Sequence, residues 1–201
     1  MPQSFESTEA RERVLDGAEK LFAQRGYRAV TLRDIASSVG VHHTTLYYHI
    51  PGGKEQLFME VIERNFRRHQ QGLREAIAQA APDLLASLYA IADWLLSQPP
   101  MDLVRLIYSD MPALDPVHTQ RITEVAYSSM LAPIESALRS GYERGEIGQH
   151  DFAHVAGAVL GMVESIYAIP GPITTVARQE IAREILDILV AGLRKHESAS
   201  Q

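Results

Sequence analysis

The side chains best suited to chemistry gather in one short stretch of the sequence, residues 42–49. Three histidines, two threonines and two tyrosines surround a single leucine there. Histidine and threonine can hydrogen-bond to base edges or phosphates, and a tyrosine hydroxyl reaches phosphates while its ring packs against sugars. No apolar pattern accounts for these polar side chains, so they favour contact with DNA. The polar residues are His42, His43, Thr44, Thr45, Tyr47, Tyr48 and His49.

A second polar group, His150, Asp151 and His154, has a spacing at which a metal could be imagined. Di-metal helical bundles need Glu-x-x-His on two helices, and the sequence contains no such motif. It also has no cysteine, no glycine-rich phosphate loop and no nucleophile elbow. A solvated helix start capped by Asp151 explains the group better. We therefore expect no catalytic residue, no metal, no cofactor and no enzymatic activity.

The elements around residues 42–49 have the pattern of a helix-turn-helix. Thr31, followed three residues later by Asp34, predicts a capping box at the start of a short helix. Ala36 is small where a second helix must cross closely, Gly40 suits a left-handed turn, and Leu46 anchors the next helix. In such a motif the second helix enters the major groove of DNA. Any tight helical hairpin shares the small residues and the glycine, so the polar surface carries the DNA interpretation.

The charge distribution permits DNA binding without requiring it. The 201 residues carry a net charge of −6. Residues 1–75 hold 11 Lys and Arg against 10 Asp and Glu, whereas residues 76–201 hold 8 against 15. The acidic excess is thus confined to the later part of the chain. The low positive charge of the first part leaves one alternative, an interaction module whose helix-turn-helix has lost its role on DNA.

With these residues in order, the chain resembles the TetR family of bacterial transcription regulators. The resemblance covers about residues 8–60 and implies a homodimer, operator binding by the N-terminal domain, and a C-terminal domain that responds to a small molecule. Repression relieved by the ligand is the mode of action that it favours. The matching positions are Arg25-Gly26-Tyr27, Thr31, Ile35-Ala36, Gly40-Val41, Thr45-Leu46-Tyr47-Tyr48-His49 and Lys54-Glu55-Gln56-Leu57-Phe58.

The resemblance also implies roles for single residues on DNA. Arg33, His43, Thr44 and Tyr47 match positions that read bases. His42 stands where the family often has a capping serine, Ile50 replaces a phenylalanine, and the connection ending at Lys54 is one residue longer than usual. The residues implied as phosphate contacts are Thr31, Thr45, Tyr48, His49 and Lys54.

Helical periodicity dominates the whole chain and predicts an all-α fold of about nine helices. Glycine and proline punctuate the expected helices, with Gly26 as the left-handed stop of the first. We expect a three-helix helix-turn-helix DNA-binding domain over residues 1–53. Residues 54–201 are expected to form a larger helical domain for ligand sensing and dimerisation.

Methionine and aromatic residues in the later helices could line a ligand pocket, since such side chains suit apolar ligands. The alternative for each is an ordinary core residue at helical spacing. The resemblance makes a pocket for a small apolar or aromatic ligand the expectation. The candidate residues are Tyr89, Trp94, Met101, Tyr108, Met111, Tyr127, Met130, Met162 and Tyr167.

The last two expected helices present an apolar surface wider than packing on their own domain requires. Small residues allow close backbone approach, so these helices could form a four-helix bundle across a two-fold axis. The alternative is a helix buried within one subunit. A dimer predicts a palindromic operator. The candidate interface residues are Ala153, Gly157, Val159, Gly161, Ile181, Ile185, Ile188 and Leu189.

The expected location is the cytoplasm. Residues 1–13 are polar and charged and do not have the apolar core of a signal peptide. No window of about 18 apolar residues suggests a membrane span. The expected partners are therefore duplex DNA, a second copy of the chain and a small ligand, with no membrane.

Overall fold

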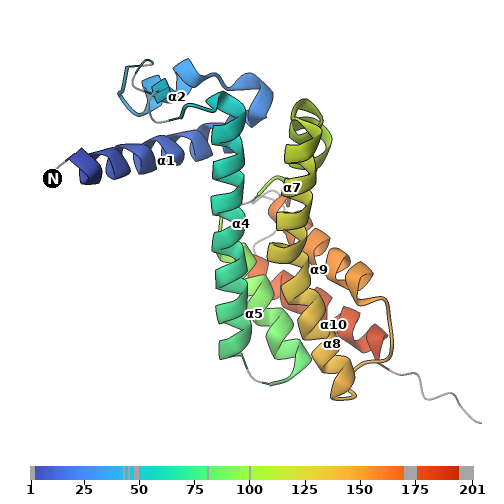
Figure 1. Cartoon of the computed structure of the whole chain (residues 1–201). Coiled ribbons are helices and arrows are strands. Elements are labelled where there is room, and N and C mark those ends of the chain that lie inside the picture. The colour runs from blue at the N-terminus through green and yellow to red at the C-terminus, as the bar shows by residue number, and fades with distance from the viewer. Residues whose placement is uncertain are drawn as a thin grey trace, which may run out of the picture. The chain divides into compact units, whose positions relative to one another are not determined.

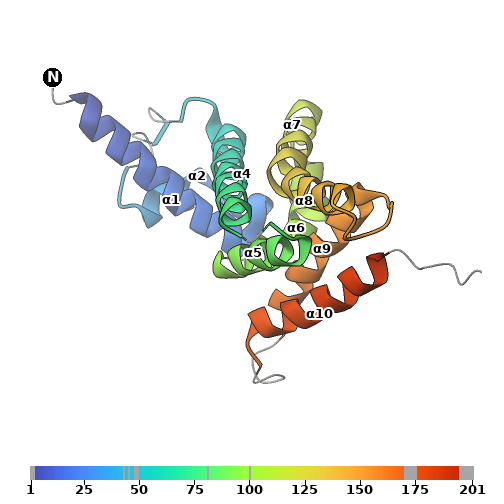
Figure 2. The same cartoon turned by 90° about the horizontal axis from the view of Figure 1, so that it is seen from below.

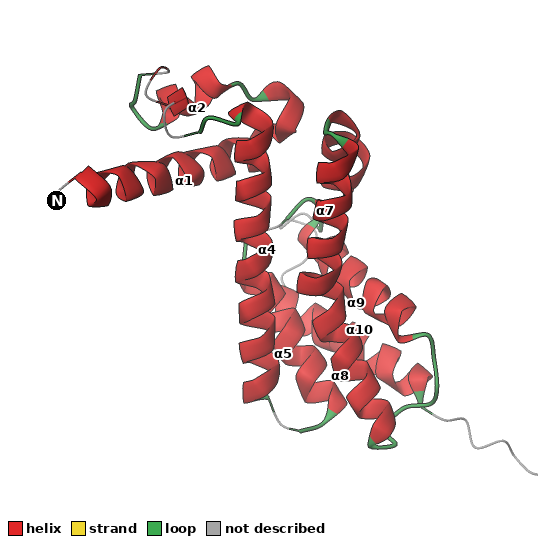
Figure 3. Ribbon diagram, in the orientation of Figure 1, coloured by secondary structure: helices red, strands yellow, loops and turns green. Residues whose placement is uncertain are grey.

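A computed structural model describes most of the chain as helices joined by short loops, with no strand among the described residues (Figure 3). This confirms the expected all-α fold. The described residues are 3–42, 44, 46–47, 50–80, 82–99, 101–169 and 176–194.

The first helix is interrupted at the glycine expected from the sequence. Gly26 has a φ of 76°, and this left-handed residue interrupts the first helix as expected. Two π-helical segments, Leu106–Asp110 and Tyr127–Leu131, break the α-helical regularity later in the chain. The α-helices are α1 (Gln3–Ala29), α2 (Leu32–Ser38), α4 (Gly53–Gln79), α5 (Leu84–Ser97), α6 (Leu103–Arg105), α7 (Pro116–Ala126), α8 (Ala132–Glu143), α9 (Phe152–Tyr167) and α10 (Arg178–Leu193).

The contacts divide the chain into two compact units. The head unit comprises Met1–Asn65 and Met101–Val125, and the body unit comprises Phe66–Pro100 and Ala126–Gln201. Helix α4 gives its first half to the head unit and its second half to the body unit (Figure 1). The domain boundary expected after residue 53 stays a prediction.

The head unit has a core of its own, built on aromatic contacts between α1 and α4. The Phe22 and Phe58 rings meet edge to face with centroids 5.0 Å apart, and Tyr27 lies 4.9 Å from Phe58. Ile35 of α2 and Leu46 are both fully buried. Burial of these side chains fixes the helical hairpin against α1.

Ion pairs join α1 to the first half of α4. The Arg64 guanidinium lies 2.6 Å from Glu19, 2.7 Å from Asp16 and 3.0 Å from Glu12. Single exposed pairs contribute little, but one arginine shared by three carboxylates forms a network. This network orients the helix that underlies the helix-turn-helix.

Residues 101–125 belong to the head unit through buried polar contacts. The Asp110 carboxylate, 4% exposed, accepts a hydrogen bond of 2.9 Å from the Tyr27 backbone N–H. Glu55 of α4 pairs with His118 of α7 and accepts from the Asp115 N–H, and these two bonds lower the pKa of Glu55. The segment is therefore tied to both long helices of the head unit.

The body unit packs α5, α8, α9 and α10 with the second half of α4. Helix α10 lies against α5 and α9 (Figures 1 and 2). Gly72 of α4 lets the Trp94 indole of α5 approach the backbone, and Gly141 of α8 does the same for Leu84. None of the described helices is long and apolar enough to cross a membrane.

Candidate functional site

The first candidate site is the helical hairpin of the head unit, whose first helix begins at a complete capping box. The Thr31 hydroxyl accepts from the Asp34 N–H at 3.2 Å, and the Asp34 carboxylate accepts from the Thr31 N–H at 2.8 Å. The same carboxylate accepts from the Thr31 hydroxyl at 2.6 Å. These bonds lower the pKa of Asp34, and the bond from the Thr31 hydroxyl has a larger effect than the bond from the Thr31 N–H. The capping box expected from the sequence is present.

The turn after α2 is set by glycine and by close helix approach. Gly40 has a φ of 69°, and the Val41 N–H donates to the Ala36 carbonyl at 3.0 Å. A side chain at Gly17 of α1 would collide with Val39, so α1 and the turn touch at that point. The expected left-handed turn is thus present, and it fixes the direction in which the chain leaves α2.

Beyond the turn, buried and exposed side chains separate clearly. Leu46 is fully buried, whereas Tyr47 beside it is 53% exposed. His42 and Thr44 are also exposed, and the His42 Nδ1 lies 2.9 Å from the Thr44 hydroxyl. Arg33 of α2 is exposed as well. Hydrogen-bonding groups therefore face outward from a hairpin that an apolar anchor holds in place.

Four of the expected DNA contacts, His43, Thr45, Tyr48 and His49, lie outside the described residues. Their roles stay predictions.

Lys54 and Thr31, both expected at phosphates, already have partners within the head unit. The Lys54 ammonium donates to the Tyr27 carbonyl at 3.0 Å and lies 4.2 Å from the centre of the Tyr27 ring. The hydrogen of the Thr31 hydroxyl points to Asp34. The ammonium keeps two further hydrogens for another acceptor. Phosphate contact by either residue stays a prediction.

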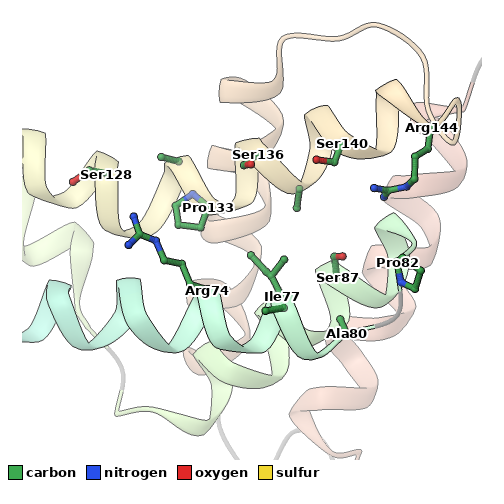
Figure 4. A pocket seen from close by; sticks show the side chains of 13 residues that line it. Arg74, Ile77, Ala80, Pro82, Ser87, Ser128, Pro133, Ser136, Ser140 and Arg144 are labelled. Atoms are coloured by element: carbon green, nitrogen blue, oxygen red, sulfur yellow. The ribbon is translucent and has the colours of Figure 1, made fainter.

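A second candidate site is a cavity of about 560 Å³ in the body unit. Its walls come from α4, the start of α5, the π-helical segment before α8, and α8 itself (Figure 4). Arg74, Ile77 and Ala78 face it from α4, and Ser87 faces it from α5. The volume lies within the range of small-molecule sites.

One face of α8 and its preceding turn supplies the opposite wall, at every fourth position. The residues at this spacing are Ser128, Ala132, Ser136, Ser140 and Arg144, and Pro133 and Ala137 lie beside them on the same wall. None of the nine residues expected from the sequence lines this cavity. The positions of the methionine and aromatic residues did not predict this cavity, whereas small or polar residues at a spacing of four are the sequence signal that accompanies it.

The five aromatic candidates mostly serve other contacts. The Tyr89 hydroxyl donates to Asp187, the Tyr127 hydroxyl to Glu135, and the Tyr167 hydroxyl to the Leu95 carbonyl. The Trp94 ring packs on Gly72, and Tyr108 is 80% exposed.

Among the four methionine candidates, Met130 is buried in the body unit and Met162 of α9 is half-buried. Met101 and Met111 are half-buried in the head unit. Their part in ligand binding, like that of the aromatic candidates, stays a prediction.

The expected dimer interface maps to an outward face of α9 and α10. Ile188 is 68% exposed and Ile185 37%, and added side chains at Gly157 and Gly161 would meet open space. Val159 differs, because it is fully buried in the core of its own body unit. Of the remaining candidates, Ala153 is exposed, and Ile181 and Leu189 are half-buried.

Comparison with known proteins finds relatives of part of the head unit. Residues 14–61 match the model for bacterial regulatory proteins, tetR family. The HTH-type transcriptional regulator LmrA of Bacillus subtilis is 43% identical over 54 residues, which span 27% of this chain and 29% of that relative. The HTH-type transcriptional repressor AcnR of Corynebacterium glutamicum is 24% identical over 192 residues, 94% of this chain and 95% of that relative. These relatives are regulators.

The fold of nearly the whole chain is also found among solved structures. The crystal structure of AibR in complex with isovaleryl coenzyme A and operator DNA superposes with a TM-score of 0.73 at 20% identity. The superposition covers 89% of this chain and 97% of AibR. The helix-turn-helix and the later helices therefore form a known combination.

Proposed function

We propose that this chain, whose residues 14–61 match the model for bacterial regulatory proteins of the tetR family, is a member of that family and a sequence-specific DNA-binding transcriptional regulator. It represses transcription from an operator and releases the operator when a small molecule binds the body unit. It acts in the cytoplasm, where operator and metabolites are both accessible. The observation that carries the proposal is the exposed polar face of the helix-turn-helix.

On this proposal the hairpin enters the major groove through the residues after Gly40. Thr44 and Tyr47 face outward while Leu46 holds the segment to the core. Arg33 of α2 offers a guanidinium to guanine or to phosphate. Phosphate contacts set the position on the duplex, and contacts to base edges give the sequence preference.

Two copies are needed to read a palindromic operator, and the outward face of α9 and α10 suits their pairing. Ile185 and Ile188 are exposed on α10, and Gly157 and Gly161 leave open space on α9. Close approach at glycines and burial of isoleucines would stabilise a helical bundle. Successive major-groove faces lie about 34 Å apart, which the two heads must match.

Ligand release has support from a structural neighbour and from the cavity. AibR was solved with both isovaleryl coenzyme A and operator DNA. The body unit of this chain has a cavity of about 560 Å³ in which a ligand could be held. A ligand shifts the protein toward a state that fits DNA less well only as far as it prefers that state.

The decisive experiment selects bound sequences from random DNA with the full chain, then measures affinity for the recovered sequence at several salt concentrations. We expect a palindrome and a steep fall of affinity with salt, because phosphate contacts release counterions. Tyr47→Ala should weaken binding by about 1 to 3 kcal/mol. Tyr108→Ala, an exposed tyrosine of the same unit outside the hairpin, is the matched control. Recovery of no sequence, or no dependence on salt, would favour an interaction module instead.

The dimer is tested separately by sedimentation of Ile188→Glu. A carboxylate in an apolar interface is left unpaired, so we expect a monomer and loss of operator affinity. Val176→Glu places the same charge at an exposed valine just before α10 and should leave the dimer intact. If the Ile188→Glu variant stays dimeric, Ile188 of α10 is not part of the dimer interface.

A further inference from the structure

We propose that the cavity of the body unit binds an amphipathic anion, with Arg74 holding its charged group. The inference rests on the proposed function, because it names the class of ligand to which the regulator responds. The sequence alone predicted a small apolar or aromatic ligand. The wall residues point to a ligand with both an apolar part and a negative end.

Arg74 is the residue from which this assignment starts. Its side chain leaves α4 toward the cavity, on the side of Ser128 and Pro133 (Figure 4). Within the part of the chain that the structure describes, its guanidinium makes no hydrogen bond or ion pair with another residue. A guanidinium carries five N–H donors and stays charged, so it offers a carboxylate or phosphate two parallel hydrogen bonds.

Arg144, the other arginine at the cavity, is in a different state. Its Nε donates to Glu146, and the second oxygen of that carboxylate accepts from the Leu84 backbone N–H at 2.6 Å. The charge of Arg144 is therefore already balanced by a carboxylate that also holds the start of α5. Of the two arginines, Arg74 alone has its charge available for a ligand.

Between the two arginines the walls of the cavity carry few polar atoms, so they suit a hydrocarbon chain. Ile77 lies on the α4 side, and Pro133 and Ala137 lie on the α8 side. The hydroxyls of Ser136 and Ser140 also face the cavity and can adapt as donors or acceptors (Figure 4). Ligand sites combine mostly apolar walls with a few polar groups that fix orientation.

The end of the cavity beside Arg74 is held by a hydrogen bond between its two walls. The Gln70 side-chain amide of α4 donates to the Ser128 carbonyl at 3.1 Å. Gln70 precedes Arg74 by four residues, so both lie on the same side of α4. The guanidinium therefore sits at a bridged end, where an anion would engage it and the apolar part would extend along α8.

Two kinds of molecule share this chemistry, a free carboxylic acid and a thioester whose carrier bears phosphates. The probes are straight-chain carboxylates of six to twelve carbons, their coenzyme A thioesters, the corresponding primary alcohols, and coenzyme A alone. Calorimetric titration of the full chain with each probe measures its affinity. Operator affinity of the same preparation, without a probe, is measured in parallel.

We expect at least one carboxylate or thioester to bind about tenfold or more tightly than its alcohol, because a hydrogen-bonded charge is lost in the alcohol. Arg74→Gln should weaken binding of that anion by a similar factor and leave the alcohol unchanged, and Arg74→Lys should retain part of the affinity. Arg194→Gln, which removes a charge from the body unit outside the cavity, should have no effect.

The remaining outcomes overturn the inference. Equal affinities for alcohol and anion, unchanged binding by Arg74→Gln, or coenzyme A alone binding as tightly as its thioesters would each do so. Absence of binding by every anion, with operator affinity intact, rejects the ligand class and leaves the DNA-binding function standing. If the wild-type chain without a probe does not bind an operator, the proposed function itself is rejected.

Discussion

The head unit presents its candidate DNA-binding groups on its surface, whereas the candidate ligand-binding groups of the body unit line a cavity. In the head unit, Tyr47 and Thr44 point outward from a hairpin held by Leu46 and by a glycine turn. In the body unit, Ser136 and Arg74 line a cavity that is open to solvent and lies between helices far apart in the sequence. The hairpin depends on local contacts, whereas the cavity exists only once the helices have packed.

The largest effect should come from the head core. Leu46→Ala removes a fully buried side chain and should lower the stability of the head unit by about 2 to 5 kcal/mol. The chain has one tryptophan, Trp94, which lies in the body unit and reports on it alone. We expect circular dichroism to show earlier unfolding while Trp94 fluorescence changes at the wild-type denaturant concentration.

Leu46→Met, which nearly conserves volume, should cost less than about 1.5 kcal/mol and serves as the control. If fluorescence and circular dichroism shift together in Leu46→Ala, the two units unfold together, and the expected separate unfolding of the head unit is contradicted.

A smaller effect is expected in the body unit from Gly72→Ala. The added methyl group would overlap the Trp94 ring, and relieving the overlap should cost about 1 to 3 kcal/mol. Trp94 fluorescence during denaturation measures the loss directly. Gly192→Ala, where nothing lies within 4 Å, should instead gain a few tenths of a kcal/mol or more from helix propensity. A stable Gly72→Ala variant would show that the body packing can adjust.

The cap of α2 should contribute less than either core. Thr31→Ala leaves the Asp34 N–H without its acceptor and should destabilise the head unit by about 1 kcal/mol. Thr31→Ser keeps the hydroxyl and should match the wild type within a few tenths of a kcal/mol. Hydrogen exchange at α2 measures both. Equal protection in Thr31→Ala and Thr31→Ser would mean that the hairpin does not depend on its cap.

The smallest effect is a dependence on pH. The pKa of Asp34 in the folded chain lies below its ordinary value of 3.8, since Thr31 donates to the carboxylate. In acid the unfolded chain takes up this proton first, so stability falls as the pH drops below that value. Asp34→Asn should lose this part of the acid sensitivity. An identical acid profile for variant and wild type would place the sensitivity elsewhere.

The hairpin could be predicted from sequence because its determinants are local. Thr31 and Asp34 form the expected cap, and Gly40 adopts the expected left-handed conformation. The polar contacts of Lys54 with Tyr27 were not foreseen, because they join residues 27 positions apart. Periodicity identifies which face of a helix is buried, but it does not identify a partner on another helix.

The cavity could not be predicted because it depends on what side chains leave unfilled. Ala132 and Ser136 look unremarkable in the sequence, and only their position opposite Arg74 and Ile77 makes them a wall. Conversely, Tyr167 looked suited to a ligand, yet its hydroxyl is bonded to the Leu95 carbonyl. Residue type suggests a chemistry, whereas packing decides whether a ligand has room to meet it.

The π-helical segment Tyr127–Leu131 has a consequence for the phase of the helix that follows it. Such a segment adds one residue to an otherwise α-helical run, and one residue corresponds to about 100° of rotation. Deleting a single residue between Ser128 and Ala132 would turn Ser136 and Ser140 by that angle relative to Ser128, which lines the same cavity. Ser128 and the serines of α8 share one wall, so we expect the length of the chain at that point to matter for the ligand site as well as the side chains.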